Sequence, residues 1–221
     1  MSPAAGDVRA EWLTIVGAAD AWRSIGLTVG ADGMIPLLGT SLRLVEASPP
    51  DLVSAPDGTG VVGWALSGMG ADGATSIDGL HTELVERQPP MFSSHAVGAS
   101  SLDHVVVLTP DLERTSAAIS ESTGSDLRRI RELGSMRQGF HRMGERGSGA
   151  LIVELVERPD VPAGPAAFWG VVLIVDDLDA AYRLIGADRI SAPKDAVQPG
   201  RRIATVRTEV GLGLPVALMT P

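Results

Sequence analysis

The sequence of 221 residues contains no cysteine, a single lysine and few aromatic residues. The absence of cysteine excludes disulfides, thiolate metal ligands and a cysteine nucleophile. Aromatic residues make up 4% of the chain and hydrophobic residues 44%, so the core must consist mainly of valine, leucine, isoleucine and alanine. No apolar run approaches the length that is needed to cross a bilayer. A chain of this length forms one large domain or two small ones.

Positive charge is also scarce. Lysine and arginine together number 18 against 27 acidic residues, which gives a formal net charge of −9. An acidic chain repels phosphate backbones, so nucleic acid is disfavoured as a partner. The N-terminal residues MSPAAGDVRAEW lack the basic stretch and apolar run of a signal peptide. We therefore expect a cytoplasmic protein without nucleic-acid or membrane partners.

Two stretches of the chain follow the same plan. Residues 102–112 read LDHVVVLTPDL and residues 168–178 read FWGVVLIVDDL, in each case an apolar strand followed by a helix start. Further on, residues 136–155 align without a gap with residues 199–218. An internal repeat of this kind predicts two copies of one supersecondary unit.

Each copy is predicted to be β-α-β-β-β. In the first copy the helix begins at Thr109 and Pro110 and ends at Gly124. Its strands are predicted near 103–108, 127–133, 136–143 and 150–157. In the second copy Asp176 caps a helix over 177–185 that ends at Gly186. The strands of the second copy are predicted near 170–175, 187–191, 202–208 and 214–219.

The N-terminal half repeats this plan in a shorter form. Its first segment is predicted to contain a helix over 18–25 and strands near 12–16, 27–29, 34–38 and 42–46. Its second segment opens with a strand at 60–68, after which no order of elements is evident up to Glu86. Stretches rich in proline, serine and glycine at 47–59, 88–101 and 158–166 are predicted to be a loop, a linker and the break between the two complete copies.

The βαβββ pattern, carried by LDHVVV and PDLE within 102–113, LIVELVE at 151–157 and WGVVLIVDDLDAA at 169–181, resembles the vicinal oxygen chelate superfamily. This superfamily comprises the glyoxalase, bleomycin-resistance and extradiol-dioxygenase proteins. The resemblance implies an α+β fold in which paired βαβββ units form curved half-barrels. It covers 101–221 well, as a complete glyoxalase-like domain with units 101–158 and 166–221. It covers 8–90 weakly, as an abbreviated and degenerate domain.

The resemblance also indicates where a metal site would lie. In the superfamily the ligands, usually His, Gln or Glu, come from the first and last strands of each unit. His104 and Glu154 match these positions in unit 101–158, whereas Gly170 and Ala217 in unit 166–221 have no donor atoms. The corresponding residues of the first N-terminal segment are Trp12 and Arg43, and an arginine repels a divalent cation.

Two ligands are too few for tight metal binding. We therefore predict no metal and no other cofactor, with a divalent metal at His104 and Glu154 as the alternative. A third ligand would have to come from His141 or Glu157, although Glu157 has the wrong strand parity relative to Glu154. His104 and Glu154 are otherwise a relic pair or the polar end of a small-molecule pocket.

The leading hypothesis is a metal-independent small-molecule binding protein with its ligand in the groove of the C-terminal domain. His104 and Glu154 would form the polar end of the groove, and Phe140, Arg142 and Trp169 would line it. The alternative is a glyoxalase-like lyase, isomerase or dioxygenase that uses His104 and Glu154 as catalytic residues, with a divalent metal or as an acid–base pair. A third possibility is a structural or dimer-forming module.

The charge and composition of the chain indicate what kind of ligand to expect. The basic stretches RRIR at 128–131 and Arg201 with Arg202 are interpreted as solvated strand edges, so few cations are expected to face the groove. A small, neutral and largely apolar ligand is therefore favoured. The chain is expected to be a monomer or a homodimer.

Overall fold

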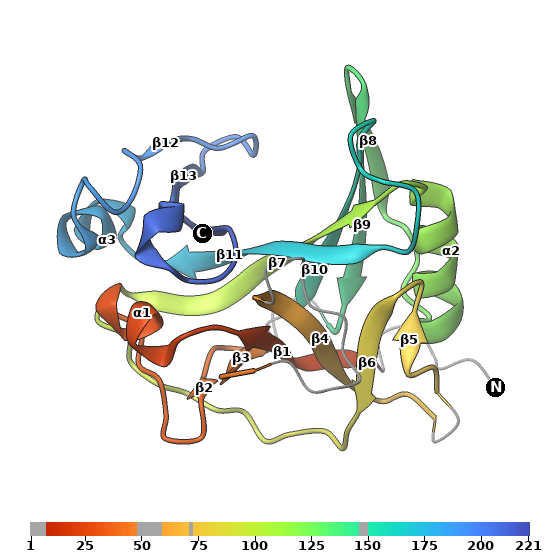
Figure 1. The fold of residues 1–221 in the computed structure, drawn as a ribbon, viewed down its shortest axis with the longest axis horizontal. Helices are drawn as coiled ribbons and strands as arrows, with labels where there is room; N and C mark the ends of the chain where they lie inside the picture. Colours follow the sequence, from red (N-terminus) through yellow and green to blue (C-terminus); the bar gives the residue numbers. More distant parts are fainter. Residues whose placement is uncertain (1–7, 48–58, 71–72, 146–149) are drawn as a thin grey trace.

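A computed structural model describes residues 8–47, 59–70, 73–145 and 150–221, which form two mixed β-sheets (Figure 1). The N-terminal sheet has six strands in the order β2-β3-β1-β4-β6-β5. The C-terminal sheet has eight, in the order β12-β13-β14-β11-β7-β10-β9-β8. The predicted α+β class is confirmed, because short helices accompany mixed sheets. Within the described residues, no helix has the length and apolar character to cross a membrane.

The C-terminal sheet consists of two βαβββ units. The first contains β7 (Ala99–Thr109), α2 (Leu112–Thr123), β8 (Arg129–Leu133), β9 (Met136–Met143) and β10 (Leu151–Glu157). The second contains β11 (Ala167–Val175), α3 (Leu178–Ile185), β12 (Lys194–Asp195), β13 (Arg202–Thr205), a helical turn (Thr208–Val210) and β14 (Val216–Met219). In each unit the first strand pairs in parallel with the last. The antiparallel pair β7 and β11 joins the units, so the predicted paired architecture is confirmed.

Strand register shows which residues of the two units are equivalent. The central pairs between β7 and β11 are related by a local twofold rotation that exchanges His104 with Gly170. The parallel pairs of β7 with β10 and of β11 with β14 make Glu154 and Ala217 equivalent in the same way. These are the equivalences that the gapless alignment of the sequence predicts.

The N-terminal sheet follows the same plan with fewer elements. Its first unit is β1 (Arg9–Val16), α1 (Ala19–Ser24), β2 (Met34–Ile35) and β3 (Ser41–Val45). Its second is β4 (Gly60–Ser67), β5 (Ser76–Ile77) and β6 (Leu80–Leu84). First and last strands again pair in parallel, and β1 and β4 join the units in antiparallel. The region that showed no order in the sequence therefore forms the β5–β6 hairpin. The loop predicted at 47–59 lies almost wholly outside the described residues.

Both C-terminal helices begin later than predicted. Asp111 and Asp177 are the N-caps, and their carboxylates accept hydrogen bonds from the backbone N–H groups of Arg114 and Ala180. An aspartate also interacts favourably with the positive end of the helix dipole, which favours it over Thr109 as a cap. The predicted end of α2 at Gly124 is confirmed, with a left-handed φ of 67°.

Two predicted strands are wrong because their backbone groups find other partners. In the segment 27–29, the N–H of Thr28 donates to the Nδ1 of His95 in the linker. In the segment 187–191, only Ile190 forms a bridge, to Val206, and the strand β12 forms further along the chain.

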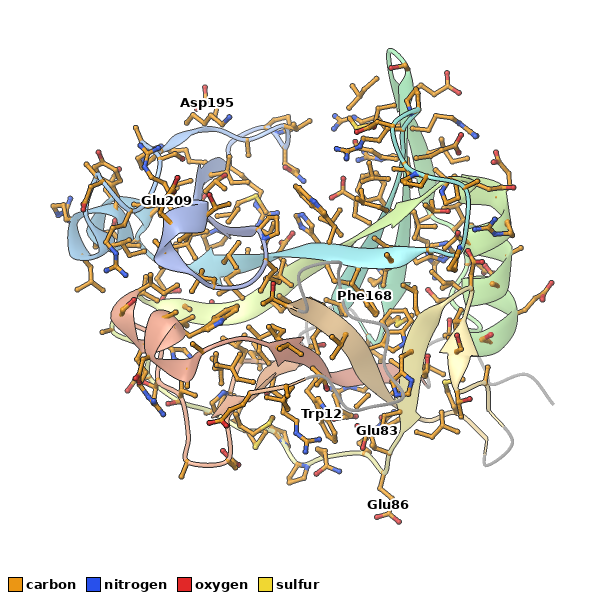
Figure 2. The ribbon with its side chains drawn as sticks, in the orientation of Figure 1. Trp12, Glu83, Glu86, Phe168, Asp195 and Glu209 are labelled. Carbon is orange, nitrogen blue, oxygen red and sulfur yellow. The ribbon has the colours of Figure 1, made fainter. Side chains whose placement is uncertain are left out.

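One continuous hydrophobic core connects the two sheets. Phe168 on β11 lies between the two sheets (Figure 2), and its ring meets that of Trp64 on β4 edge to face, with centroids 5.2 Å apart. Leu38 also forms a backbone bridge to Ser101 on β7. Burial of one large apolar side chain stabilises a fold by roughly 1.5–3 kcal/mol, so these contacts couple the two sheets firmly.

Candidate functional site

The polar centre of the C-terminal sheet is built on an irregularity in β7. Between Leu102 and His104 this strand carries one residue, Asp103, that has no counterpart on β11. Such a β-bulge turns the extra side chain toward the face of its neighbour, whereas regular alternation would point it to the opposite face. Asp103 Oδ2 consequently lies 2.6 Å from His104 Nδ1.

His104 lies between two carboxyl groups. Its Nδ1 faces Asp103, and its Nε2 is 3.3 Å from Glu154 Oε2 on the neighbouring strand β10. The two residues that match the ligand positions of the superfamily in this unit therefore lie next to each other. When Nδ1–H donates to Asp103, Nε2 keeps its lone pair, so the imidazole presents a proton acceptor beside Glu154.

The two carboxyl groups have pKa values shifted in opposite directions. Burial raises the pKa of Glu154, and the nearby His104 offsets this only in part. Burial also acts to raise the pKa of Asp103, but hydrogen bonds and charge from His104 and Arg201 outweigh it and hold that pKa below its ordinary value. At neutral pH Asp103 is therefore held as an anion, and Glu154 is the carboxyl that protonates more readily.

Two further side chains complete a polar row across the sheet. Gln138 on β9 donates through Nε2 to Glu154 Oε1 at 2.6 Å. At the other end, Arg201 Nη2 donates to Asp103 Oδ1 at 2.9 Å, and its Nε donates to the carbonyl oxygen of Thr220. The row is thus fixed at both ends by hydrogen bonds to charged groups, which are stronger than those between neutral groups.

A groove with two lobes opens on either side of this row. In Figure 1 the strands β8 and β9 and the strands β12 and β13 rise on opposite sides of β7 and β11. The first lobe has a volume of about 330 Å³ and is lined mainly by aliphatic side chains of β7, β11 and β14. The second, of about 370 Å³, reaches Arg131 and Lys194. The residues that line both lobes are His104, Gln138, Glu154, Ile203 and Thr205.

Of the other three residues predicted to line the groove, two line it and one does not. Phe140 lines the second lobe and has the guanidinium of Arg129 above its ring, 5.1 Å from the centroid. Trp169 lines the first lobe, with 45% of the residue exposed. Arg142 shares the face of Phe140 by strand alternation, but it lines neither lobe.

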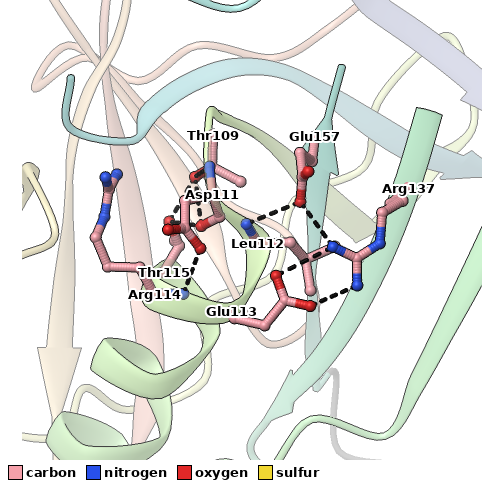
Figure 3. Close-up of polar contacts among 8 residues, drawn as sticks. All are labelled: Thr109, Asp111, Leu112, Glu113, Arg114, Thr115, Arg137 and Glu157. Carbon is pink, nitrogen blue, oxygen red and sulfur yellow. Dashed lines mark hydrogen bonds and ion pairs between the residues drawn. The ribbon is translucent and has the colours of Figure 1, made fainter. Parts of the chain in front are cut away.

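The two candidates for a third metal ligand face away from the groove. His141 is fully buried under α2, where Ser116 Oγ and the carbonyl oxygen of Ser125 contact its ring nitrogens. Glu157 accepts hydrogen bonds from the N–H of Leu112, at the start of α2, and from Arg137 (Figure 3). Both residues hold α2 against the sheet, so neither is available to a metal at His104.

The donor set does not fit the metal that the superfamily resemblance implies. Gly170 and Ala217 stand at two of the four ligand positions and have no donor atoms. A Cβ atom on Gly170 would lie 2.7 Å from the carbonyl oxygen of Pro215, so the backbone excludes a side chain there. Among the residues that the structure describes, no three His, Cys, Asp or Glu side chains are grouped to hold a metal ion.

The bulge of β7 recurs at the equivalent position of all four first strands. The extra residues are Glu11 on β1, Val62 on β4, Asp103 on β7 and Trp169 on β11. Each directly precedes the position equivalent to His104. All four units therefore share the β-bulge, and they differ only in the side chains that it carries.

In the N-terminal sheet, three of the four equivalent positions carry side chains that lie close together, and the fourth is Gly63. Register makes Trp12 equivalent to His104, and it makes Arg43 and Glu83 equivalent to Glu154 and Ala217. The Arg43 guanidinium lies 5.9 Å from the centroid of the Trp12 ring and 3.9 Å from Glu83 Oε2. A larger hollow of about 780 Å³ lies beside α1, and no site is assigned to it.

Sequence reasoning missed several residues of this site. The contact of Asp103 with His104 could not be predicted, because a β-bulge that contains no glycine does not change the alternating pattern of apolar and polar residues. Gln138 could have been predicted as a groove residue, because it lies two residues from Phe140 on the same predicted strand and therefore on the same face. Arg131 and Arg201 were interpreted as solvated edges, but Arg131 lines the groove and Arg201 pairs with Asp103. Their roles depend on contacts between distant strands.

Comparisons with known proteins show similarity in structure only. No protein-family profile and no curated protein sequence matches the chain. A mutant form of 4-hydroxymandelate synthase from Streptomyces coelicolor is similar with a TM-score of 0.63 and 14% identity, over 99% of this chain and 92% of that one. Methylmalonyl-CoA epimerase from Mycobacterium tuberculosis gives a TM-score of 0.46 and 18% identity, over 56% of this chain and 89% of that one.

Proposed function

We propose that this chain, which has the fold of the vicinal oxygen chelate proteins, is a metal-independent small-molecule binding protein. Its ligand would occupy the groove of the C-terminal sheet. The observation that carries the proposal is the two-lobed groove with His104, Glu154 and Gln138 between its lobes. Small-molecule sites are concave and mostly apolar, with a few convergent polar groups, and the groove has this composition.

The lining of the groove describes the expected ligand. The first lobe is lined mainly by aliphatic side chains, together with Trp169 and with Arg158, whose charge is paired with Asp160, so the body of the ligand is largely apolar. At the row between the lobes, His104, Glu154 and the amide of Gln138 offer hydrogen-bond donors and acceptors. A hydroxyl or carbonyl oxygen of the ligand is the natural partner for this row.

A thermal-shift screen tests the proposal. Small neutral aromatic and polyketide-like compounds are compared with sugar phosphates and dicarboxylates. Compounds with an apolar body should raise the melting temperature, because a ligand that binds only the folded state stabilises it by mass action.

Two variants locate the site in this screen. Thr205 is exposed and lines both lobes, so Thr205→Trp should fill the groove and remove the stabilisation. Thr208→Trp is the matched control, because Thr208 is equally exposed but lines neither lobe. Stabilisation that persists in Thr205→Trp, or that no compound produces in the wild type, would contradict the proposal.

A second function, acid–base catalysis of the lyase or isomerase type, is favoured by the contact of Asp103 with His104. Asp103 orients the imidazole through Nδ1, which leaves the lone pair of Nε2 on the side of Glu154, where it is placed to remove a proton from a bound ligand. Burial keeps Glu154, on the same side, more readily protonated, which suits a proton donor. The two groups thus have the properties of an acid–base pair.

Hydrogen exchange tests the catalytic hypothesis on compounds that the screen identifies. Incubation with the protein in D₂O should replace an acidic hydrogen of the ligand, as measured by NMR. His104→Gln should abolish this exchange while it retains ligand binding. Exchange at an unchanged rate in His104→Gln would rule out His104 as the base and leave the binding function standing.

A further inference from the structure

Two cationic side chains that form no ion pair with the described residues line the second lobe of the groove, although the chain as a whole has a net charge of −9. Arg131 on β8 and Lys194 on β12 line this lobe from its opposite sides. A third cation, Arg129, lies over the ring of Phe140 in the same lobe. Lys194 is also the only lysine of the chain.

Strand pairing shows that these cations face the groove. Arg131 is paired with Gln138, and Lys194 is paired with Ile203. Residues directly opposite each other on antiparallel strands share a face of the sheet. Because Gln138 and Ile203 line both lobes, Arg131 and Lys194 project from the same face.

Two carboxyl groups, those of Glu154 and Asp195, also line this lobe, and the charge of Arg131 acts on Glu154 at longer range. The nearest partners of the acidic residues are nevertheless other side chains. Asp195 is paired with Arg202, on the face where Arg202 forms an ion pair with Asp179 of α3. Figure 2 shows Asp195 at the outer rim of the C-terminal sheet. Asp103 is bonded to Arg201, and Glu154 faces His104 and Gln138.

The two cations themselves have no such partners. Over the described parts of the chain, the side chains of Arg131 and Lys194 make no hydrogen bond or ion pair. Elsewhere in this acidic protein many arginines are paired with a carboxylate, as Arg137 is with Glu113. Two unpaired cations that face one cavity therefore form an anion-binding arrangement.

We propose that the groove binds an amphipathic monoanion, with its apolar body in the first lobe, an oxygen at the row of His104 and Gln138, and a carboxylate between Arg131 and Lys194. This inference rests on the proposed function. It differs from the expectation based on composition, because the ligand is now anionic and not neutral. Net charge describes the whole surface, and exposed charges beyond about 8 Å are screened at physiological salt. The unpaired cations in the lobe therefore govern the local preference.

A matched pair of fluorescent probes tests the charge preference. Anilinonaphthalene sulfonate and phenylnaphthylamine share an aromatic body, but only the first carries an anionic group, and both brighten in apolar sites. The anionic probe should bind the wild type about tenfold more tightly. Lys194→Gln and Arg131→Gln should each weaken its binding by about threefold to fivefold, the size of a partly exposed ion pair. Neither substitution should change the affinity of the neutral probe.

The control removes one positive charge from the other face of the molecule. Arg183 is an exposed residue of α3 that lines neither lobe, so Arg183→Gln should leave both affinities unchanged. A second readout uses the single lysine. Bound anionic probe should slow acylation of Lys194, measured by peptide mass mapping, and bound neutral probe should not.

The outcomes separate this inference from the proposed function on which it rests. Equal affinity for both probes, sensitive to Thr205→Trp but not to Lys194→Gln or Arg131→Gln, would overturn the anionic ligand and retain the binding groove. A loss of affinity in Arg183→Gln equal to that in Lys194→Gln would also overturn it. Probe binding that is unaffected by Thr205→Trp would show that the groove is not the site and would contradict both proposals.

Discussion

The two units of the C-terminal sheet have the same backbone plan and opposite chemistry. The bulge in β7 brings Asp103 beside His104, and the equivalent bulge in β11 brings Trp169 beside Gly170. One unit therefore supplies His104, which Asp103 holds from the side, and the other supplies an apolar wall to the same lobe. The twofold-related backbone thus fixes the positions of the side chains. Their different chemistry makes the groove asymmetric, which suits a ligand with one polar and one apolar end.

The N-terminal sheet extends this comparison. Trp12, Arg43 and Glu83 stand at three of the equivalent positions and contact one another. Their charges are thus satisfied within the protein, whereas Arg131 and Lys194 in the C-terminal groove are not. A site that satisfies itself has little to offer a ligand, so the C-terminal sheet is the better candidate for binding.

The largest effect is expected when the histidine of the first unit is placed in the second. Gly170→His should lower the free energy of unfolding by roughly 3 kcal/mol, because its Cβ would contact the backbone of Pro215. Urea denaturation measures the loss. Gly70→His is the control, because no atom lies within 4 Å of a Cβ at Gly70. Equal denaturation midpoints for the two variants would show that the close approach to Pro215 does not constrain the second unit.

Removal of the charge that distinguishes the first unit should have the next largest effect. Asp103→Asn should destabilise the protein by about 1–2 kcal/mol at neutral pH, because Asp103 is bonded to His104 and Arg201. Its pKa is lowered in the fold, so the stabilisation is complete above the ordinary aspartate pKa and is lost as the pH falls through the folded value.

Chemical denaturation at a series of pH values tests whether the stabilisation by Asp103 is lost as the pH falls. The difference between the wild type and Asp103→Asn should be full at neutral pH and should vanish in strong acid. Asp179→Asn provides the comparison, because its ion pair with Arg202 is exposed and should contribute little. A difference for Asp103→Asn that persists unchanged in acid would contradict the charge-based account.

Glu154→Gln should have a smaller effect of opposite sign. Because the pKa of Glu154 is raised in the fold, its ionised form is disfavoured there. This cost is absent below the ordinary glutamate pKa and grows as the pH rises to the folded value. Relative to the wild type, Glu154→Gln should therefore gain stability between acid and neutral pH. The same denaturation series measures it, and a relative loss over that range would refute the assigned direction.

Metal ions should have the smallest effect. Purified protein should contain at most a substoichiometric amount of divalent metal, and EDTA should leave the melting temperature unchanged, because half a ligand set gives too little affinity to stabilise the fold. Elemental analysis of protein prepared without an affinity tag measures the content. A full equivalent of metal that disappears in His104→Ala would reverse this expectation and favour the enzyme hypothesis.

Much of the C-terminal fold could be predicted because its signals are local. Apolar strands, a proline and glycine around α2, and a gapless repeat together specify the βαβββ order and the equivalence of Glu154 with Ala217. Strands of two residues, such as β5 and β12, were missed because so short a segment has no periodicity. The contact of Asp103 with His104 was missed for a different reason, because strand alternation places neighbours on opposite faces and the bulge reverses that rule.

The core that Trp64 and Phe168 share across the two sheets has a consequence for how the molecule unfolds. Unfolding of either half exposes apolar surface of the other, so heat or denaturant should melt the chain in one cooperative transition. A fragment that begins at the linker would carry the whole groove but would expose the face of β11 that packs on β4. Such a fragment should aggregate or recruit a partner to cover that face. The N-terminal half thus covers an apolar face of the sheet that carries the groove, irrespective of any ligand of its own.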